Sequence, residues 1–380
     1  MSTLMAEMSA KALRLGIPLG VHLDLTYRCN ERCVHCYLDH DDHGEMTTAE
    51  IKDLLHQLAD AGVFFLSLSG GEIFLRKDLF EIIELARALM FSVKLKTNAV
   101  MIRPADAERI AGLNVESVQI SVYSHRPEVH DGITKLPGSL KRTLEGARRL
   151  RAAGVKVYFA DVLMRDNFHD HAGVRALAEG MGAHFTVDPT VTPMMDGDRS
   201  ILSLNIEHED LREVFRDPAL VGGATDFCAP PTGPMDAEEA LDAVPCSAGH
   251  TFCYVSPYGD LYPCVQFPLP SGNVRKQSFI DIWRHSPQLN DVRTITISEV
   301  QGCSTCAHSG SCTRCPGLAY MEGNMRGPSS QDCEKSFART GVVTNGMLAK
   351  LSAGGSMPRG LVQIQRQSIA AQTIVSSCQS

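Results

Sequence analysis

Short apolar segments alternate with amphipathic segments along the first half of the chain. Residues 48–61 show the helical repeat clearly, because four apolar side chains recur on one helix face at i, i+3, i+4 and i+7 spacing. Residues 78–90 repeat this pattern, and Thr47 or Thr48 and Asp78 stand before the two helices as N-cap candidates. The segments that read as strands are 21–25, 64–69, 93–97, 117–122, 155–163 and 184–187.

This alternation predicts an α/β fold. Six β–α units in succession predict a parallel sheet with right-handed crossovers. The number of units fits a barrel, a partial barrel or an open sheet, and periodicity alone does not choose among them. In each case the functional loops are expected beyond the carboxyl ends of the strands, where the first cysteines and several glycines fall.

The pattern changes near residue 225. Residues 226–245 are rich in Pro, Gly and Ala and are interpreted as a linker between a domain at 20–225 and a cysteine-rich, turn-rich region at 246–340. Within that region only residues 279–283 stand out as a helix, so metal is expected to hold it together. Residues 1–19 form an N-terminal extension, and the polar residues 341–380 are expected to form a flexible tail.

Charge and hydropathy argue against several classes of function. The net charge of −8 argues against a general nucleic-acid-binding protein. The sequence has neither an uncharged run of 18 apolar residues nor an N-terminal signal segment, so a cytoplasmic protein without membrane attachment is expected. Thiols stay reduced in that compartment, and the 13 cysteines fall in tight groups. Their spacing therefore favours zinc or iron–sulfur sites over disulfides.

The first cysteine group follows the first predicted strand as C-N-E-R-C-V-H-C, residues 29–36. Three thiolates, from Cys29, Cys33 and Cys36, are enough to hold three irons of a four-iron cluster and to leave the fourth iron open for chemistry. A zinc site is the alternative, with His35 or the acidic, histidine-containing residues 39–43 as its fourth ligand.

Gly70, Gly71 and Glu72 follow the second predicted strand. Adjacent glycines let the backbone approach a ligand closely, and their N–H groups suit a carboxylate or an amino-acid-like ligand. Alone, this tripeptide is weak evidence for a ligand site, because it is more often a plain strand-to-helix turn. Its position one β–α unit after the cysteine group makes it strong evidence.

C-x3-C-x2-C after one strand and G-G-E after the next resemble the radical S-adenosylmethionine superfamily. The resemblance implies a partial (βα)6 TIM-like barrel, followed by a small cysteine-rich iron–sulfur domain. It also implies a [4Fe–4S] cluster on Cys29, Cys33 and Cys36, whose open iron binds S-adenosylmethionine. Reductive cleavage of that cofactor would yield a 5′-deoxyadenosyl radical that abstracts hydrogen from a substrate. Implied cofactor contacts are His35, Tyr37, Gly70, Gly71, Glu72, Asn98, Ser121, Arg165 and Asn167.

The second cysteine group supplies eight thiols, enough for two further four-iron clusters or for two zinc sites. It resembles the SPASM extension of the same superfamily, with residues 259–264 as the G-x4-C element. The resemblance implies a nearer auxiliary cluster on Cys246, Cys253, Cys264 and Cys315, and an outer one on Cys303, Cys306, Cys312 and Cys333. Two residues separate Cys312 from Cys315 where the family usually has three, so the partition is left open.

Some relatives carry an acidic general base directly after the cysteine that matches Cys264. Val265 and Gln266 stand there instead, and the sequence identifies no catalytic residue. Cys228 and Cys378 are left over and are interpreted as free thiols.

Relatives with this extension mostly modify peptides, as the pyrroloquinoline quinone and mycofactocin maturases do. The resemblance therefore favours a maturase of ribosomally made peptides, with flavodoxin or ferredoxin as reductant. About twenty residues precede the first strand, so a leader peptide would need a separate peptide-binding chaperone. The alternatives are a radical enzyme that modifies a small molecule such as a porphyrin or sugar, and a non-catalytic electron-transfer or zinc protein.

Overall fold

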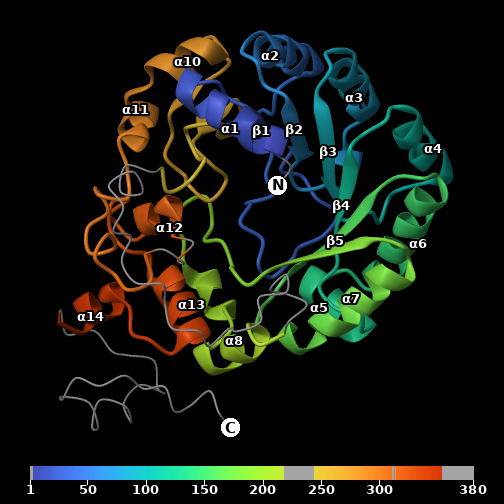
Figure 1. Cartoon of the computed structure of the whole chain (residues 1–380). Coiled ribbons are helices and arrows are strands. Elements are labelled where there is room, and N and C mark those ends of the chain that lie inside the picture. Colours follow the sequence, from blue (N-terminus) through green and yellow to red (C-terminus); the bar gives the residue numbers. More distant parts are fainter. Residues whose placement is uncertain (1–2, 218–243, 310–311, 313, 353–380) are drawn as a thin grey trace. The chain divides into compact units, whose positions relative to one another are not determined.

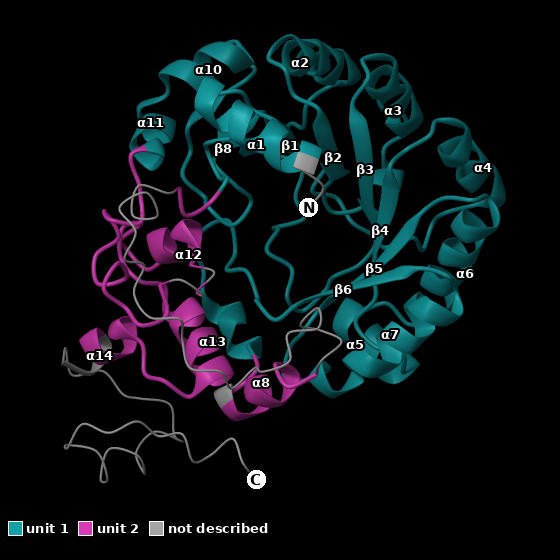
Figure 2. Ribbon diagram, viewed as in Figure 1, with its two compact units in different colours: residues 1–205, 247–293 teal, residues 206–246, 294–380 magenta. Residues whose placement is uncertain are grey.

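The computed structural model describes residues 3–217, 244–309, 312 and 314–352. The chain divides into two compact units, coloured separately in Figure 2: Met1–Asn205 with Ser247–Arg293, and Ile206–Cys246 with Thr294–Ser380. Residues 247–293 therefore belong to the first unit, whereas the sequence placed the division before residue 246. Residues 226–243 of the expected linker and 353–380 of the expected tail lie outside the described residues.

Unit 1 is built on a parallel sheet, as predicted. Its strands are β1 (Gly20–Asp24), β2 (Phe65–Ser69), β3 (Ser92–Thr97), β4 (Ser117–Ser121), β5 (Val157–Val162) and β6 (His184–Asp188). Each pairs in parallel with the next strand along the chain, and the curved sheet that results is a partial TIM barrel (Figure 1). The six strand segments expected from the sequence agree with these bounds to within two residues at each end.

Helices cover the outer face of this sheet (Figure 1). They are α2 (Thr48–Asp60), α3 (Leu79–Ala88), α4 (Pro104–Gly112), α6 (Ser139–Ala152) and α7 (His171–Gly180), preceded by α1 (Thr3–Leu15). The short helix α5 (Pro127–Thr134) follows β4, and its Ile133 and Thr134 carbonyls accept hydrogen bonds from the N–H groups of Val34 and Arg32. Thr47 caps α2 in a capping box with Glu50, as its sequence suggested. Asp78 stands at the N-cap of α3, but its side chain makes no capping bond and binds Arg76 instead. The cap expected at Asp78 was therefore wrong.

The two faces of the strands differ in polarity. Residues of one parity, such as Leu66 and Leu68 of β2 and Val93 and Leu95 of β3, are fully buried against the helices. Residues of the other parity point into the barrel, because successive side chains of a strand alternate between its faces. That inner face is polar: it carries His22, Asp24, Ser67, Ser69, Lys94, Lys96, Gln119 and Ser121. The outer, apolar face stabilises the fold, and the inner face is left for a ligand.

Residues 247–293 extend the same sheet beyond β1. Strand β7 (Phe252–Val255) pairs in parallel with β1, and β8 (Asp260–Tyr262) and β9 (Gly272–Asn273) continue the sheet in antiparallel fashion. Helices α10 (Phe279–His285) and α11 (Pro287–Arg293) follow. Trp283 of α10 is buried and donates its indole N–H to the carbonyl of Gly16, 2.7 Å away. This bond ties α10 to the segment that leads into β1.

Unit 2 contains more helix than the sequence indicated. It holds α8 (His208–Val214), α12 (Pro316–Met321), α13 (Ser330–Thr340) and α14 (Asn345–Ser352), and α8 packs against α13. The expectation of a single helix in the cysteine-rich region was therefore wrong, and part of the expected tail is the helix α14. These helices are short and their apolar faces narrow, so their periodicity is hard to detect. Within the described ranges, every helix is too short or too polar to cross a lipid bilayer.

A buried polar network joins β1 to β7. The carboxylate of Asp24 lies 3.0 Å from the Nε2 atom of His22 and accepts a hydrogen bond from the hydroxyl of Tyr254, 2.9 Å away. The hydroxyls of Tyr254 and Tyr27 are 2.6 Å apart. These groups are nearly inaccessible to water, so each depends on the others to satisfy its hydrogen bonds.

We expect Tyr254→Phe to lower the free energy of unfolding by about 1–3 kcal/mol, since it leaves polar oxygens of Asp24 and Tyr27 without a partner. Tyr262→Phe is the matched control, because Tyr262 stacks on Tyr254 from the neighbouring strand and lies outside this network. Urea unfolding of both variants measures the difference. Equal destabilisation would show that the network contributes nothing beyond packing.

Candidate functional site

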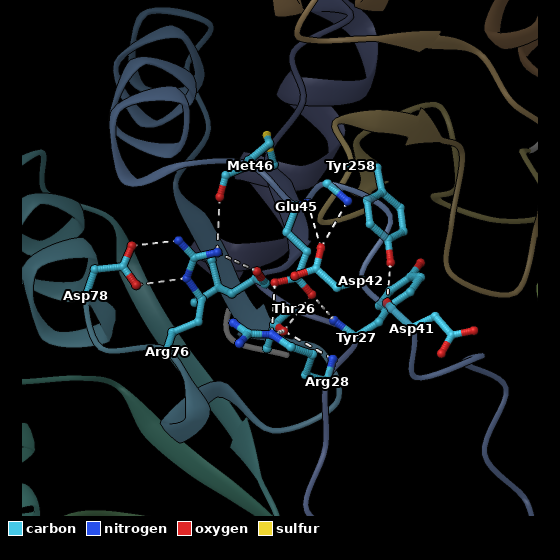
Figure 3. Close-up of polar contacts among 12 residues, drawn as sticks. Thr26, Tyr27, Arg28, Asp41, Asp42, Glu45, Met46, Arg76, Asp78 and Tyr258 are labelled. Atoms are coloured by element: carbon cyan, nitrogen blue, oxygen red, sulfur yellow. Dashed lines mark hydrogen bonds and ion pairs between the residues drawn. The ribbon is translucent and has the colours of Figure 1, made fainter.

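The loop that joins β1 to α2, residues 25–47, carries the first cysteine group and is called here the cysteine loop. Its two ends are held together by Glu45, shown in Figure 3. The Glu45 carboxylate accepts hydrogen bonds from the hydroxyl of Thr26 at 2.6 Å and from the backbone N–H of Tyr27 at 2.8 Å. The loop is thus closed at its base, and the three cysteines lie on the closed segment.

Arg76 closes the same base from the neighbouring β–α unit (Figure 3). Its guanidinium donates to the backbone carbonyls of Leu25 at 3.0 Å and Met46 at 3.1 Å, one on each end of the cysteine loop. A bidentate pair with Asp78, at 2.9 and 2.6 Å, fixes the plane of that guanidinium. The Arg76 side chain is only 7% exposed, so little of this interaction is lost to water.

Gly70 and Gly71 let the cysteine loop touch the end of β2. A Cβ atom at Gly70 would lie 2.2 Å from the carbonyl oxygen of Thr26, and one at Gly71 would lie 2.4 Å from that of Arg28. Gly70 also has a φ of +135°, which favours glycine. The N–H groups of Gly71 and Glu72 donate to those two carbonyls at 2.7 and 2.9 Å. The glycines therefore bring two backbone segments together, whereas the sequence suggested only an approach to a ligand.

All three cysteines of the loop line one cavity of about 360 Å³ at the carboxyl ends of the strands. Burial raises the pKa of the Cys29 thiol to about 12 and raises the pKa values of Cys33 and Cys36 as well. Buried thiolates need nearby positive charge, and bound iron supplies it. Among the described residues, no three His, Cys, Asp or Glu side chains are grouped closely enough to hold a single metal ion. The thiols share a cavity, and this donor set fits an iron–sulfur cluster.

Most of the expected cofactor contacts meet at this cavity. Its wall includes His35, Tyr37, Gly70, Gly71, Asn98 and Ser121. His35 packs edge-on against Tyr123 with 4.7 Å between ring centroids, and burial lowers the pKa of His35 to about 4, so its ring is neutral. The amide of Asn98 donates to Asn30 at 2.9 Å, directly beside Cys29.

Three expected contacts do not line the cavity. Glu72 is buried behind it, and its carboxylate accepts hydrogen bonds from the hydroxyl of Thr97 at 2.8 Å and from the N–H of Asn98 at 2.9 Å. The amide of Asn167 donates to the carbonyl of Tyr123 at 2.8 Å, and Arg165 is exposed. Glu72 and Asn167 thus hold strand ends in place, and contacts of these three side chains with a cofactor remain unproven predictions.

Several cavity residues were missed by the sequence analysis. They come from the barrel strands and from the segment after β8: His22, Lys96, Gln119, Asp161, Thr186, Asp188 and Gln266. The sequence does contain a pattern that marks them, because polar residues occupy alternate positions of strands that are otherwise apolar. Such a pattern is usually interpreted as a solvent-facing side of a strand, and only the curvature of the sheet shows that this side lines a cavity.

A second cavity, of about 70 Å³, lies within unit 2. Its wall includes Cys303, Cys306, Cys312 and Cys333, the set implied for the outer auxiliary cluster. Burial raises the pKa of Cys303 to about 11 and that of Cys333 to about 12. Four thiols, two of them on buried residues, around one small cavity fit a fully ligated cluster.

The set implied for the nearer auxiliary cluster is spread over both units. Cys253, on β7, and Cys264, after β8, belong to unit 1, whereas Cys246 and Cys315 belong to unit 2. Burial raises the pKa of the Cys253 thiol, and the guanidinium of Arg293 opposes that shift. The assignment of these four cysteines to one cluster stays a prediction.

Arg76→Gln is expected to lower the free energy of unfolding by about 3 kcal/mol, because two loop carbonyls lose their donor and the Asp78 carboxylate keeps only the hydroxyl of Thr48. Arg109→Gln removes an exposed pair with Glu84 and is expected to cost about 1 kcal/mol at most. Urea unfolding of the purified apoprotein compares the two variants. A small effect at Arg76 would contradict its role at the base of the cysteine loop.

Gly70→Ala and Gly71→Ala are each expected to destabilise the protein by more than about 2 kcal/mol and to reduce the iron held after reconstitution, because Cβ would displace the cysteine loop. Gly112→Ala is the matched control, since a Cβ at that helical position meets no atom within 4 Å. Thermal unfolding and iron analysis test both effects. Retention of normal stability and iron by the Gly70 and Gly71 variants would refute the close-approach argument.

Comparison with known proteins agrees with this geometry. A family model described as "Radical SAM superfamily" matches residues 23–177, and one described as "Iron-sulfur cluster-binding domain" (SPASM) matches residues 246–316. The first match runs from the end of β1 through the cysteine loop into α7, and the second begins at Cys246.

Curated relatives differ in their activities. PqqA peptide cyclase of Xanthomonas axonopodis pv. citri is 32% identical over 323 residues, which cover 80% of this chain and 84% of the relative. Mycofactocin maturase MftC of Mycobacterium tuberculosis is 29% identical over 310 residues, 78% of each chain. AdoMet-dependent heme synthase of Methanosarcina barkeri is 28% identical over 326 residues, 80% of this chain and 92% of the relative.

Solved structures share the fold. Streptococcus suis SuiB bound to precursor peptide SuiA matches with a TM-score of 0.68 at 17% identity, over 86% of this chain and 79% of that chain. The enzyme anSMEcpe with bound AdoMet matches with a TM-score of 0.64 at 14% identity, over 92% of this chain and 98% of that chain. With the cysteine cavity, the two family matches and the similarity to PqqA peptide cyclase, the chain belongs to the radical S-adenosylmethionine superfamily and carries a C-terminal SPASM domain.

Proposed function

We propose that this radical S-adenosylmethionine enzyme modifies a peptide. When bound, the [4Fe–4S] cluster at Cys29, Cys33 and Cys36 would supply the electron that cleaves S-adenosylmethionine. The residues of this chain would hold that cluster on a closed loop. S-adenosylmethionine would lie beside His35, Asn98 and Ser121, which line the cavity, and the barrel interior would remain for the substrate.

The polar barrel interior is the observation that carries the peptide proposal. Gln119 and Thr186 on the strands, and Thr192 and Gln266 beside them, offer hydrogen-bonding groups along the cavity wall. Such groups can hydrogen-bond to the N–H and C=O groups of a peptide, whereas a flat apolar macrocycle offers them no hydrogen bond. Two of the three relatives named above, MftC and PqqA peptide cyclase, carry names that refer to maturation or a peptide.

Modification of a small molecule is the second candidate. The heme synthase relative is almost as similar as the two maturases and aligns over 92% of its own length, which favours this alternative. A precursor peptide encoded beside the gene would supply the first substrate to test, and a porphyrin with carboxylate side chains the second. A mass change in the peptide, with release of 5′-deoxyadenosine, would support the proposal; a change in the porphyrin alone would overturn it.

Anaerobic reconstitution of the wild-type chain is expected to yield about twelve irons, for three four-iron clusters. Joint replacement of Cys29, Cys33 and Cys36 by Ala is expected to remove about four irons and to abolish release of 5′-deoxyadenosine after reduction. Cys228→Ser is the control and is expected to change neither quantity. About eight irons in the wild-type chain would reject one auxiliary cluster, and zinc in place of iron would reject the radical mechanism.

A further inference from the structure

Lys96 is a cation on the inner face of the barrel. In β3 the side chains of Val93 and Leu95 are fully buried in the apolar core, so Lys94 and Lys96 point to the opposite face. Lys94 lies 3.5 Å from the carboxylate of Glu116, near the start of the strand. Lys96, one step further along the same face, lines the cavity that the three cysteines share.

The ammonium of Lys96 has no direct counter-ion. Within the part of the chain that the structure describes, Lys96 is the only lysine or arginine in the wall of this cavity, and no hydrogen bond or ion pair satisfies it. Asp24 exerts the largest favourable charge interaction on Lys96, but His22 and the hydroxyl of Tyr254 occupy one oxygen each of the Asp24 carboxylate. Asp188 already accepts a hydrogen bond from the N–H of Thr190, 2.9 Å away.

Burial dominates the electrostatics of this side chain. It lowers the pKa of Lys96, although the carboxylates of Asp24 and Asp188 and the thiol of Cys264 act in the opposite direction. The charged form is therefore held at a cost in desolvation that the protein itself offsets only in part. An anion placed in the cavity would recover that free energy.

The position of Lys96 on the strand indicates which bound molecule supplies the anion. Asn98, beside Cys29, marks the level of the cofactor site at the carboxyl end of β3. Lys96 precedes it by two residues on the same strand face, so its Cα lies about 6–7 Å deeper in the barrel. In the register of the sheet Lys96 is paired with Gln119, another cavity residue. A molecule below the cofactor, rather than the cofactor, would meet both side chains.

We propose that Lys96 anchors a carboxylate of the substrate and so fixes which end of the substrate faces the cofactor. This inference rests on the proposed function, because it assigns the barrel interior to the substrate. The carboxylate belongs either to an acidic residue of a peptide or to a small organic acid, and the same ammonium would hold both.

Isothermal titration of the reconstituted, S-adenosylmethionine-loaded enzyme tests the assignment. The peptide probe is N-acetyl-glutamate N-methylamide, compared with its glutamine counterpart, and the small-acid probe is glutarate. The wild-type enzyme is expected to bind the glutamate probe about tenfold more tightly than the glutamine probe, the preference of a charge-assisted hydrogen bond over a neutral one. Lys96→Gln is expected to abolish that preference, and Lys96→Arg to retain part of it. Lys94→Gln, on the same strand face, is the matched control and keeps it.

The outcomes separate the two proposals. Equal affinity of the wild-type enzyme for both probes, no binding of the glutamate probe, or a preference that survives in Lys96→Gln overturns the role of Lys96. Weakened S-adenosylmethionine binding in Lys96→Gln with an intact preference also overturns it, because Lys96 would then serve the cofactor.

A stronger response to the glutamate probe than to glutarate identifies an acidic residue of a peptide as the ligand, and the reverse identifies a small organic acid. Absence of 5′-deoxyadenosine from the reduced wild-type enzyme refutes the proposed function, while the probe titration still decides the role of Lys96.

Discussion

The close approach of two backbone segments, the start of the cysteine loop and the end of β2, is the constraint on which the site depends. Only residues without a side chain fit at Gly70 and Gly71, because a Cβ atom would stand 2.2–2.4 Å from the carbonyl oxygens of Thr26 and Arg28. The loop carbonyls in turn accept hydrogen bonds from the N–H groups that follow each glycine. The cysteines are thus placed by main-chain contacts, which are stiffer than contacts between long side chains.

Two charged side chains add to the backbone contacts that fix the cysteine loop. Glu45 accepts hydrogen bonds from the hydroxyl of Thr26 and the N–H of Tyr27, and Arg76 binds a carbonyl on each end of the loop. Both act on the base of the loop, and the thiols of Cys29, Cys33 and Cys36 face the cavity. Such a loop needs contacts other than its cysteines to close it, because the cysteines help to close it only when metal is bound.

The barrel reverses the usual assignment of strand faces to core and solvent. Its outer face is the apolar core, covered by helices, and its inner face is lined by hydrogen-bonding and charged groups. Strand β7 joins this sheet next to β1, so residues matched by the SPASM family model take part in the same compact unit as the radical S-adenosylmethionine barrel. The cavity is therefore lined by both parts of the sequence, through residues of the barrel strands and Gln266 after β8.

The sequence by itself determined the order of strands and helices, the place of the cysteine loop after β1 and the superfamily, because these depend on local periodicity and on closely spaced motifs. It did not determine the helices of unit 2, because they are short or, like α13, bury polar residues such as Asp332 and Ser336 among the apolar ones. Nor did it predict that Glu72 and Asn167 hold strand ends or that Arg76 closes the loop, because their partners lie on other β–α units. Only the tertiary structure decided that Lys96 faces a cavity: the curvature of the sheet turns one parity of every strand inward, and no local pattern encodes that curvature.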